Sequence, residues 1–209
     1  MNKITKIRER YRVKNSAAAT TFSSDGLNWR HLAFWRNMFL YYWFFAFFGH
    51  ILEALWRQIT HNQYFDPDNI PTIAPLAAPY GLGAVAIILI VWPLCKRFKR
   101  INILVIFILS MIITTVVEYL CAIVIIAFLG HNPFWDYSSE PFNFQGQICL
   151  RNAVLFGIIS TVFLRVLFPR IEQRTTKISE KLLNDIFLLL FTTYIADVLM
   201  VFITWLVNR

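Results

Sequence analysis

The stretch "INILVIFILSMIITTVVEYLCAIVIIAFL" (101–129) decides the fold, because its only charged residue is Glu118. About 20 consecutive apolar residues suffice to carry a helix across roughly 30 Å of hydrocarbon. This stretch is therefore predicted to be a transmembrane helix. It also raises a question, since an acid in hydrocarbon needs a partner, a water-filled cavity or a function.

The rest of the chain has the same character. Its 209 residues are 57% hydrophobic and 15% charged, whereas soluble domains average about 45–50% apolar and about 25% charged residues. We predict an all-α fold, a polytopic membrane bundle of five transmembrane helices over residues 34–209, preceded by a basic tail over residues 1–33. The other four spans are predicted at about 35–56, 76–95, 150–168 and 182–207.

The basic residues predict the orientation of the bundle. Eight Lys and Arg residues lie in residues 1–36, four in 96–100 and five in 165–181, all on one side of the five spans. The other side holds only Arg57, Arg151 and Arg209. Cytoplasmic loops carry such an excess, so we expect a multi-pass protein of the cytoplasmic (plasma) membrane, with its N-terminus inside and its C-terminus outside. This distribution accounts for the net charge of +8 without a nucleic-acid partner.

Three acids lie within the predicted spans, namely Glu53, Glu118 and Asp197. Each follows the last basic residue before it by 16 to 18 residues, which is about 25 Å along a helix rising 1.5 Å per residue. We therefore expect the three carboxylates at one depth, in the outer half of the bilayer. Small and hydroxylated residues surround them on their helices, as on faces that pack against other helices in lipid.

Two interpretations of these acids remain open. They pair with arginines across the bundle to fix its packing, or they line a polar chamber, open to the outer surface, that binds or passes a substrate. The residues predicted to line such a chamber are Glu53, Glu118, Asp197, Arg151, His50, Tyr119 and Asn152.

A polar segment, "FWDYSSEPFNFQGQICLRN" (134–152), joins the third and fourth spans on the outer side. Irregular backbone is tolerated near the membrane only where protein or water satisfies it, and this segment carries its own donors and acceptors. We expect the 130–149 loop to cap the chamber through Trp135, Asp136, Tyr137, Asn143 and Gly146. The spacing of His50 and Glu53 is a weak metal signal, so we expect neither a metal nor a cofactor.

Four strings of the sequence resemble a known family: "FFGHILEALW" (47–56), "PLAAPYGLGA" (75–84), "VVEYLCA" (116–122) and "WDYSSEPFNFQGQICLRN" (135–152). They are similar to the CmpB-like family of bacterial membrane proteins, whose members are described as type IV ABC-transporter permeases. The resemblance covers roughly residues 38–165 and implies transport. It departs from the family in the first outer loop, which reads "YFDPDNIPTIAP" (64–75) where a basic residue and glycines are usual.

The sequence contains no GxxxxGK[ST] phosphate loop, so an ABC permease would need a separate ATPase and a second copy to reach about ten helices. We therefore expect a transporter or permease component whose partners are membrane lipids, an ATPase subunit and a second copy. The alternatives are a membrane-embedded enzyme acting on a lipid or cell-envelope substrate at the outer leaflet, and a non-catalytic membrane subunit. An enzyme is the less favoured interpretation, because GxSxG and HExxH are both absent.

Overall fold

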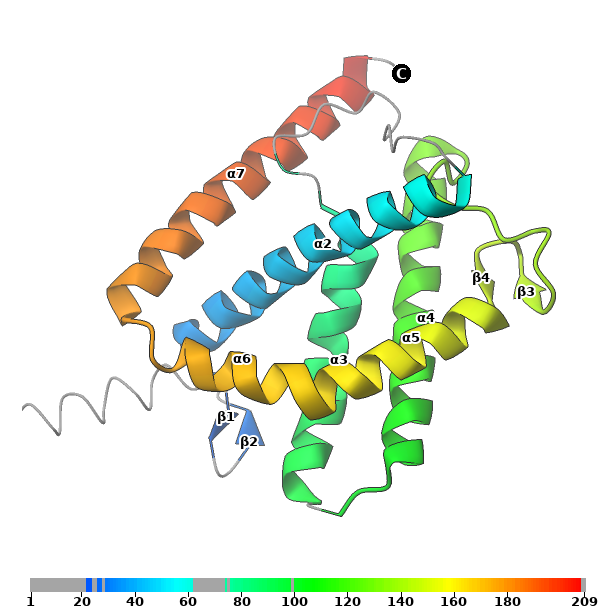
Figure 1. Cartoon of the computed structure of the whole chain (residues 1–209). Helices are drawn as coiled ribbons and strands as arrows, with labels where there is room; N and C mark the ends of the chain where they lie inside the picture. The colour runs from blue at the N-terminus through cyan, green and yellow to red at the C-terminus, as the bar shows by residue number, and fades with distance from the viewer. Residues whose placement is uncertain are drawn as a thin grey trace, which may run out of the picture.

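The computed structural model describes residues 22–23, 26–27, 29–61, 74, 76–98 and 100–207. Five helices in this part of the chain are long and apolar enough to cross a membrane, which confirms the predicted fold class (Figure 1). They are α2 (Leu32–His61), α3 (Ala78–Arg97), α4 (Ile103–Leu129), the continuous run of α5 (Leu150–Val162), η1 (Phe163–Leu167) and α6 (Phe168–Thr175), and α7 (Glu180–Val207). Two short hairpins pair β1 (Phe22–Ser23) with β2 (Gly26–Leu27) and β3 (Asn143–Phe144) with β4 (Ile148–Cys149).

The ends of α4 follow from its sequence. Asn102 caps the helix at the start, where its side-chain oxygen accepts a hydrogen bond from the backbone N–H of Leu104 at 2.9 Å. Gly130 ends it in the left-handed conformation, with φ of 79°, which glycine adopts without a steric penalty. Between these caps nothing in the sequence interrupts the helix.

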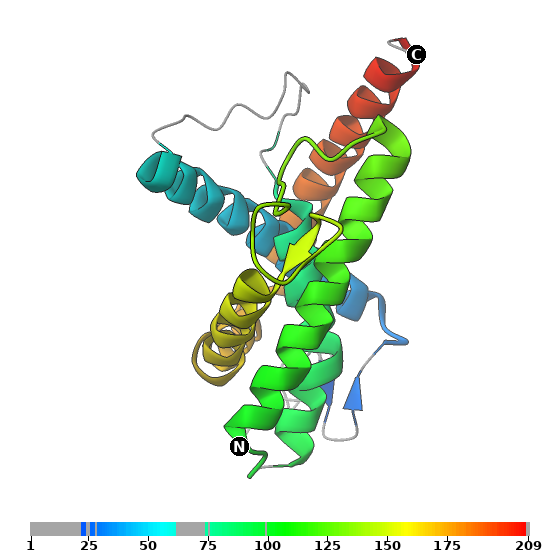
Figure 2. The same ribbon diagram turned by 90° about the vertical axis from the view of Figure 1, so that its right-hand side faces the viewer.

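The helices pack in the order α2, α3, α4, α5 (Figure 1). Helix α7 contacts the first half of α2, and the two helices diverge beyond it (Figure 2). Two glycines permit the closest approaches. A Cβ at Gly81 of α3 would lie 2.6 Å from the carbonyl oxygen of Tyr42 on α2, and one at Gly157 of α5 would lie 2.7 Å from the ring of Phe107 on α4. Small residues at such contacts let helices approach where lipid supplies no hydrophobic driving force.

The apolar core lies where α2, α3, the first turns of α4 and η1–α6 meet. It includes Phe34, Ile88, Ile106, Leu164 and Phe168, each almost fully buried. Toward their other ends α2 and α5 diverge, and in Figure 2 the last turns of α2 project away from α4. The bundle is therefore tightly packed at one end and open between α2 and α5 at the other.

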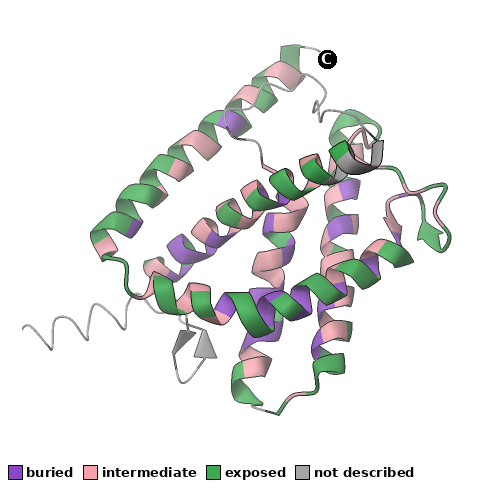
Figure 3. Ribbon diagram, in the orientation of Figure 1, coloured by how far each residue is buried: buried purple, intermediate pink, exposed green. Residues whose placement is uncertain are grey.

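Helix α7 is peripheral. Of its residues only Leu183 and Asp197 are buried, and Figure 3 shows most of its surface as exposed. Its exposed side chains are largely apolar, as suits a helix in contact with lipid.

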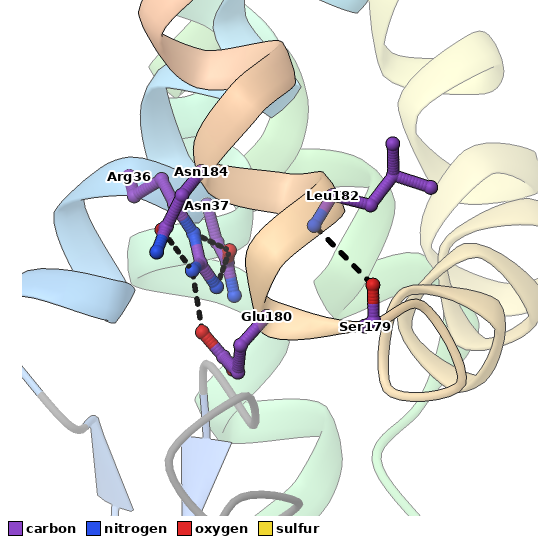
Figure 4. A network of polar contacts seen from close by, with 6 residues as sticks. All are labelled: Arg36, Asn37, Ser179, Glu180, Leu182 and Asn184. Atoms are coloured by element: carbon purple, nitrogen blue, oxygen red, sulfur yellow. Dashed lines mark hydrogen bonds and ion pairs between the residues drawn. The ribbon is translucent and has the colours of Figure 1, made fainter.

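A buried polar network attaches the start of α7 to the start of α2 (Figure 4). The guanidinium of Arg36, only 6% exposed, donates to Glu180 Oε2 at 2.5 Å and to Asn184 Oδ1 at 2.7 Å. It also donates to the side-chain oxygen of the neighbouring Asn37 at 3.0 and 3.1 Å. The backbone N–H of Leu182 donates to Ser179 Oγ at 3.2 Å, which caps α7. A buried guanidinium charge such as that of Arg36 is tolerated only where its N–H groups are hydrogen-bonded.

Two further basic residues lie at the same end of the bundle. Lys96, at the end of α3, pairs with Glu172 of α6 at 2.8 Å. Arg165, in η1, donates to the carbonyl oxygen of Ile101 at 2.7 Å. Among the described residues, Arg36, Lys96 and Arg165 thus lie at one end of the fold, each bonded to a neighbouring element.

The predicted helix ends differ from the observed ones at several places. The first helix, predicted over 35–56, runs over Leu32–His61, and the fourth, predicted to end at 168, continues to Thr175. A hydropathy pattern predicts only the apolar part of a helix, which suits lipid. The hydrogen-bonded helix also includes polar turns on either side of that part, so it is longer than predicted. Most of the tail predicted over residues 1–33 lies outside the described residues, and so do residues 62–73 and 75 of the first outer loop, predicted over 61–81.

Candidate functional site: an apolar cavity and its cap

The loop between α4 and α5 folds into a cap built on the β3–β4 hairpin. Gln147 donates its backbone N–H to the carbonyl oxygen of Phe144 at 3.1 Å, and the two residues between them have positive φ values, 55° at Gln145 and 69° at Gly146. Positive φ at both central residues is typical of the type I′ turns that join tight hairpins. The Trp135 indole donates to the carbonyl oxygen of Gln147 at 2.9 Å, which ties the first half of the loop to the hairpin.

Asp136, Asn143 and Gly146 hold the cap together. Asp136 Oδ1 accepts hydrogen bonds from the backbone N–H of Ser138 at 2.9 Å and from its hydroxyl. These bonds favour the charged carboxylate and hold the pKa of Asp136 below its usual value. Asn143 accepts from the Gly146 N–H at 3.1 Å and donates to the carbonyl oxygen of Glu140 at 2.8 Å. A Cβ at Gly146 would lie 2.9 Å from Asp136 Oδ1, so this position needs glycine for space as well as for its φ.

Two consecutive residues of α4 attach the cap to the bundle. The hydroxyl of Tyr137 donates to Glu118 Oε1 at 3.1 Å, and the side-chain amide of Asn152, in the first turn of α5, hydrogen-bonds the same hydroxyl. Burial, followed by the charge of Glu118, raises the pKa of Tyr137, so this hydroxyl stays protonated. The next residue, Tyr119, donates to Gln145 Oε1 at 2.8 Å.

A cavity of about 360 Å³ lies between α2 and α5. No described residue of the 130–149 loop lines it, and the loop is linked to its wall through the hydrogen bond from Tyr137 to Glu118. The walls of the cavity are mainly apolar. They comprise Phe45, Phe48, Gly49 and Leu52 of α2, Pro79, Tyr80, Gly83, Ala84 and Ile87 of α3, Phe156, Ile158, Ile159, Ser160 and Val162 of α5, Phe163 and Leu167 of η1, and Thr114 and Glu118 of α4. Phe48 and Leu52 on one rim and Ile159 and Val162 on the other are 44–51% exposed. The cavity thus opens sideways, between α2 and α5.

Glu118 is the one acidic side chain among the described residues that line this cavity. It is 94% buried, being 6% exposed. The hydroxyl of Tyr137 donates to Glu118 Oε1, whereas Glu118 Oε2 is buried and has no hydrogen-bond partner. Leaving a buried carboxylate oxygen unpaired costs about 1–3 kcal/mol or more, so a donor supplied by a ligand would be stabilising.

Of the residues predicted to line a chamber, only Glu118 lines this cavity. Glu53 on α2 is an electrostatic neighbour of both Glu118 and His50. Asp197 on α7 accepts a hydrogen bond from the backbone N–H of Ala74 at 3.1 Å, and so holds the loop before α3. The three acids therefore do not gather around one cavity.

Arg151 likewise takes a place outside the cavity. Its Nη1 pairs with Glu140 Oε1 of the cap at 2.9 Å, and its side chain is 63% exposed. Arg151 therefore pairs with Glu140 of the loop and not with an acid within a span.

Sequence reasoning missed the aromatic walls of the cavity and Ser160. Phe45, Phe48 and Phe156 have the same apolar character as residues that face lipid, so no local pattern distinguishes them. Two features of the sequence could have indicated the cavity wall, because they put small or polar residues within a span. These are Thr114, four residues before Glu118, and the "PYGLG" string (79–83).

One family model matches residues 40–202, and its description is "Putative ABC-transporter type IV". The match includes α3, α4 and the run from α5 to α6 in full, most of α2 and α7, the 130–149 loop and Glu118. No curated protein and no solved structure matches the chain.

Proposed function

Since this chain belongs to the family described as type IV ABC transporters, we propose that it is the membrane-embedded permease component of an ABC transporter. The cavity between α2 and α5 is its transport site, and the 130–149 loop caps that site. The observation that carries the proposal is the buried Glu118 carboxylate, whose Oε2 has no partner at the wall of the cavity. An ionisable residue within the apolar part of a membrane protein is by default a candidate for a substrate path.

The proposal assigns the chain to the cytoplasmic membrane, with the basic end of the bundle inside. Positively charged residues accumulate on the cytoplasmic side of membrane proteins. Lys96, Arg165 and the segment between α6 and α7 then present the surface to which an ATPase subunit binds. Two copies of the chain, side by side in the lipid, supply ten helices.

The test is isolation of the affinity-tagged full chain from its native membranes in mild detergent. We expect an ATPase with a phosphate loop in stoichiometric amount by mass spectrometry, with ATP hydrolysis that vanadate inhibits. The Glu118→Gln variant should retain this ATPase, because Glu118 lies far from the basic end, but should lose transport. Recovery of the chain without any ATPase, and without ATP hydrolysis, would contradict the proposal.

A further inference from the structure

The cavity has the composition of a site for an amphiphile. Its walls are aliphatic and aromatic side chains, and its polar groups are few: the hydroxyls of Tyr80, Thr114 and Ser160 and the carboxylate of Glu118. Thr114 donates to the carbonyl oxygen of Ser110 at 2.8 Å within α4. Ligand sites typically combine such apolar walls with a small number of placed polar groups that fix orientation.

The charge of the site is one-sided. Glu118 lines the cavity and Glu53 is its electrostatic neighbour, whereas none of the described lining residues is basic. Among the described residues, Arg151 at the start of α5 is engaged by Glu140. A ligand that carries a positive charge would meet its counter-charge here, whereas a fatty acid or a phosphate ester would meet repulsion.

The volume limits the size of the ligand. About 360 Å³ lies near the lower end of the range for small-molecule pockets, about 300–1,000 Å³. Together with the sideways opening between Phe48 and Leu52 of α2 and Ile159 and Val162 of α5, it suits one alkyl chain or a small ring system that enters from the lipid.

We propose that this cavity binds a single-chain or ring-bearing amine from the membrane, with the ammonium group paired with the Glu118 carboxylate and the apolar body against the walls of α2 and α5. Oε2 is buried and lacks a donor, so the ammonium reaches it when the carboxylate turns toward the cavity. This names the substrate class of the transport site and in that sense rests on the proposed function.

The experiment measures binding alone, with the full chain in nanodiscs of a zwitterionic lipid and no ATPase present. The probes are three dodecyl chains with the same diazirine, ending in an amine, an alcohol or a carboxylate. We expect saturable photolabelling of α2 and α5 peptides by the amine, with the alcohol and the carboxylate at least tenfold weaker. A desolvated hydrogen bond to a charged group is worth a factor of this size.

Variants decide whether Glu118 is responsible. Glu118→Gln should reduce labelling by the amine to the level of the alcohol, and Glu118→Asp should restore part of it. Asp185→Asn is the matched control, an exposed acid near the start of α7, and should label like the wild type. Gly83→Leu should reduce labelling by all three probes, because it fills the cavity while its Cβ position, 3.7 Å from Thr114, is free of overlap. Each variant is first checked for a single monodisperse species.

The outcomes separate the two proposals. Equal labelling by the amine and the alcohol, or full labelling of Glu118→Gln by the amine, overturns the inference even if an ATPase co-purifies. Saturable, Glu118-dependent labelling by the amine supports it even if no ATPase is found, in which case the transport proposal alone fails.

Discussion

At the scale of single residues, Glu118 and Tyr137 link the cap to the cavity. The tyrosine hydroxyl comes from a loop that is polar along most of its length, and the carboxylate comes from the most apolar helix of the chain. A buried acid without this donor would have both oxygens unpaired, so the cap stabilises the acid that a ligand would use. Family membership and composition do not reveal this contact, which depends on how the loop folds.

Tyr137→Phe should destabilise the protein by about 1–3 kcal/mol, because it leaves Glu118 buried without its donor. The matched control is Tyr119→Phe, which removes the exposed hydrogen bond to Gln145 and should cost less than about 1 kcal/mol. Thermal unfolding in the same detergent measures both. Equal destabilisation by the two substitutions would contradict this prediction, because the buried hydrogen bond to Glu118 would then contribute no more stability than the exposed one to Gln145.

The hydrogen bonds of Asp136 make a second residue-scale prediction, which concerns pH. The pKa of Asp136 is lower in the folded loop than in the unfolded chain, so its contribution to stability is complete above the unfolded value of about 3.9 and disappears as pH falls through the lower, folded pKa. Asp136→Asn should therefore lower the unfolding temperature more at pH 7 than at pH 3. A difference that persists unchanged at pH 3 would contradict this role.

At the scale of the helices, contacts through glycine set the packing. A Cβ at Gly49 of α2 would lie 2.3 Å from Cγ of Tyr80 on α3, a distance that requires the helices to move. Gly83, in the same cavity wall, leaves room for a Cβ. Gly49→Ala should thus destabilise the bundle by about 1–3 kcal/mol, whereas Gly83→Ala should be nearly neutral. Unfolding in detergent compares the two, and equal stabilities would contradict the packing described.

The five spans could be predicted from the sequence because length and apolarity alone decide whether a helix can cross a membrane. The ends of α2 and α6 could not, since a helix continues past the residues that suit lipid. Arg36 illustrates how contacts between helices escape such a prediction: it was counted only among the basic residues of the cytoplasmic side, whereas in the structure it is buried against Glu180 and Asn184.

The candidate site was only partly predictable for a related reason. Depth along each helix placed Glu53, Glu118 and Asp197 at one level, but rotation and tilt decide what each faces. Glu118 lines the cavity, whereas Asp197 holds Ala74. The cavity exists because α2 and α5 diverge, and no residue pattern in either helix records that angle.

At the scale of the whole molecule, the orientation in the membrane is the first prediction to test. Single cysteines at Ser139 in the cap and at Thr176 between α6 and α7, in a background without Cys95, Cys121 and Cys149, should react on opposite sides of intact cells. A membrane-impermeant maleimide should label position 139 directly and position 176 only after the membrane is opened. The reverse pattern would invert the proposed topology.

The central claim is that the cavity beside Glu118 is the site of transport. The measurement that tests it most directly is ATP-dependent movement of tritiated dodecylamine across vesicles that contain the chain with its ATPase. The wild type and Asp185→Asn should transport the amine at similar rates, and Glu118→Gln should be at least tenfold slower while it still retains the ATPase. Equal rates in Glu118→Gln and the wild type would contradict the account.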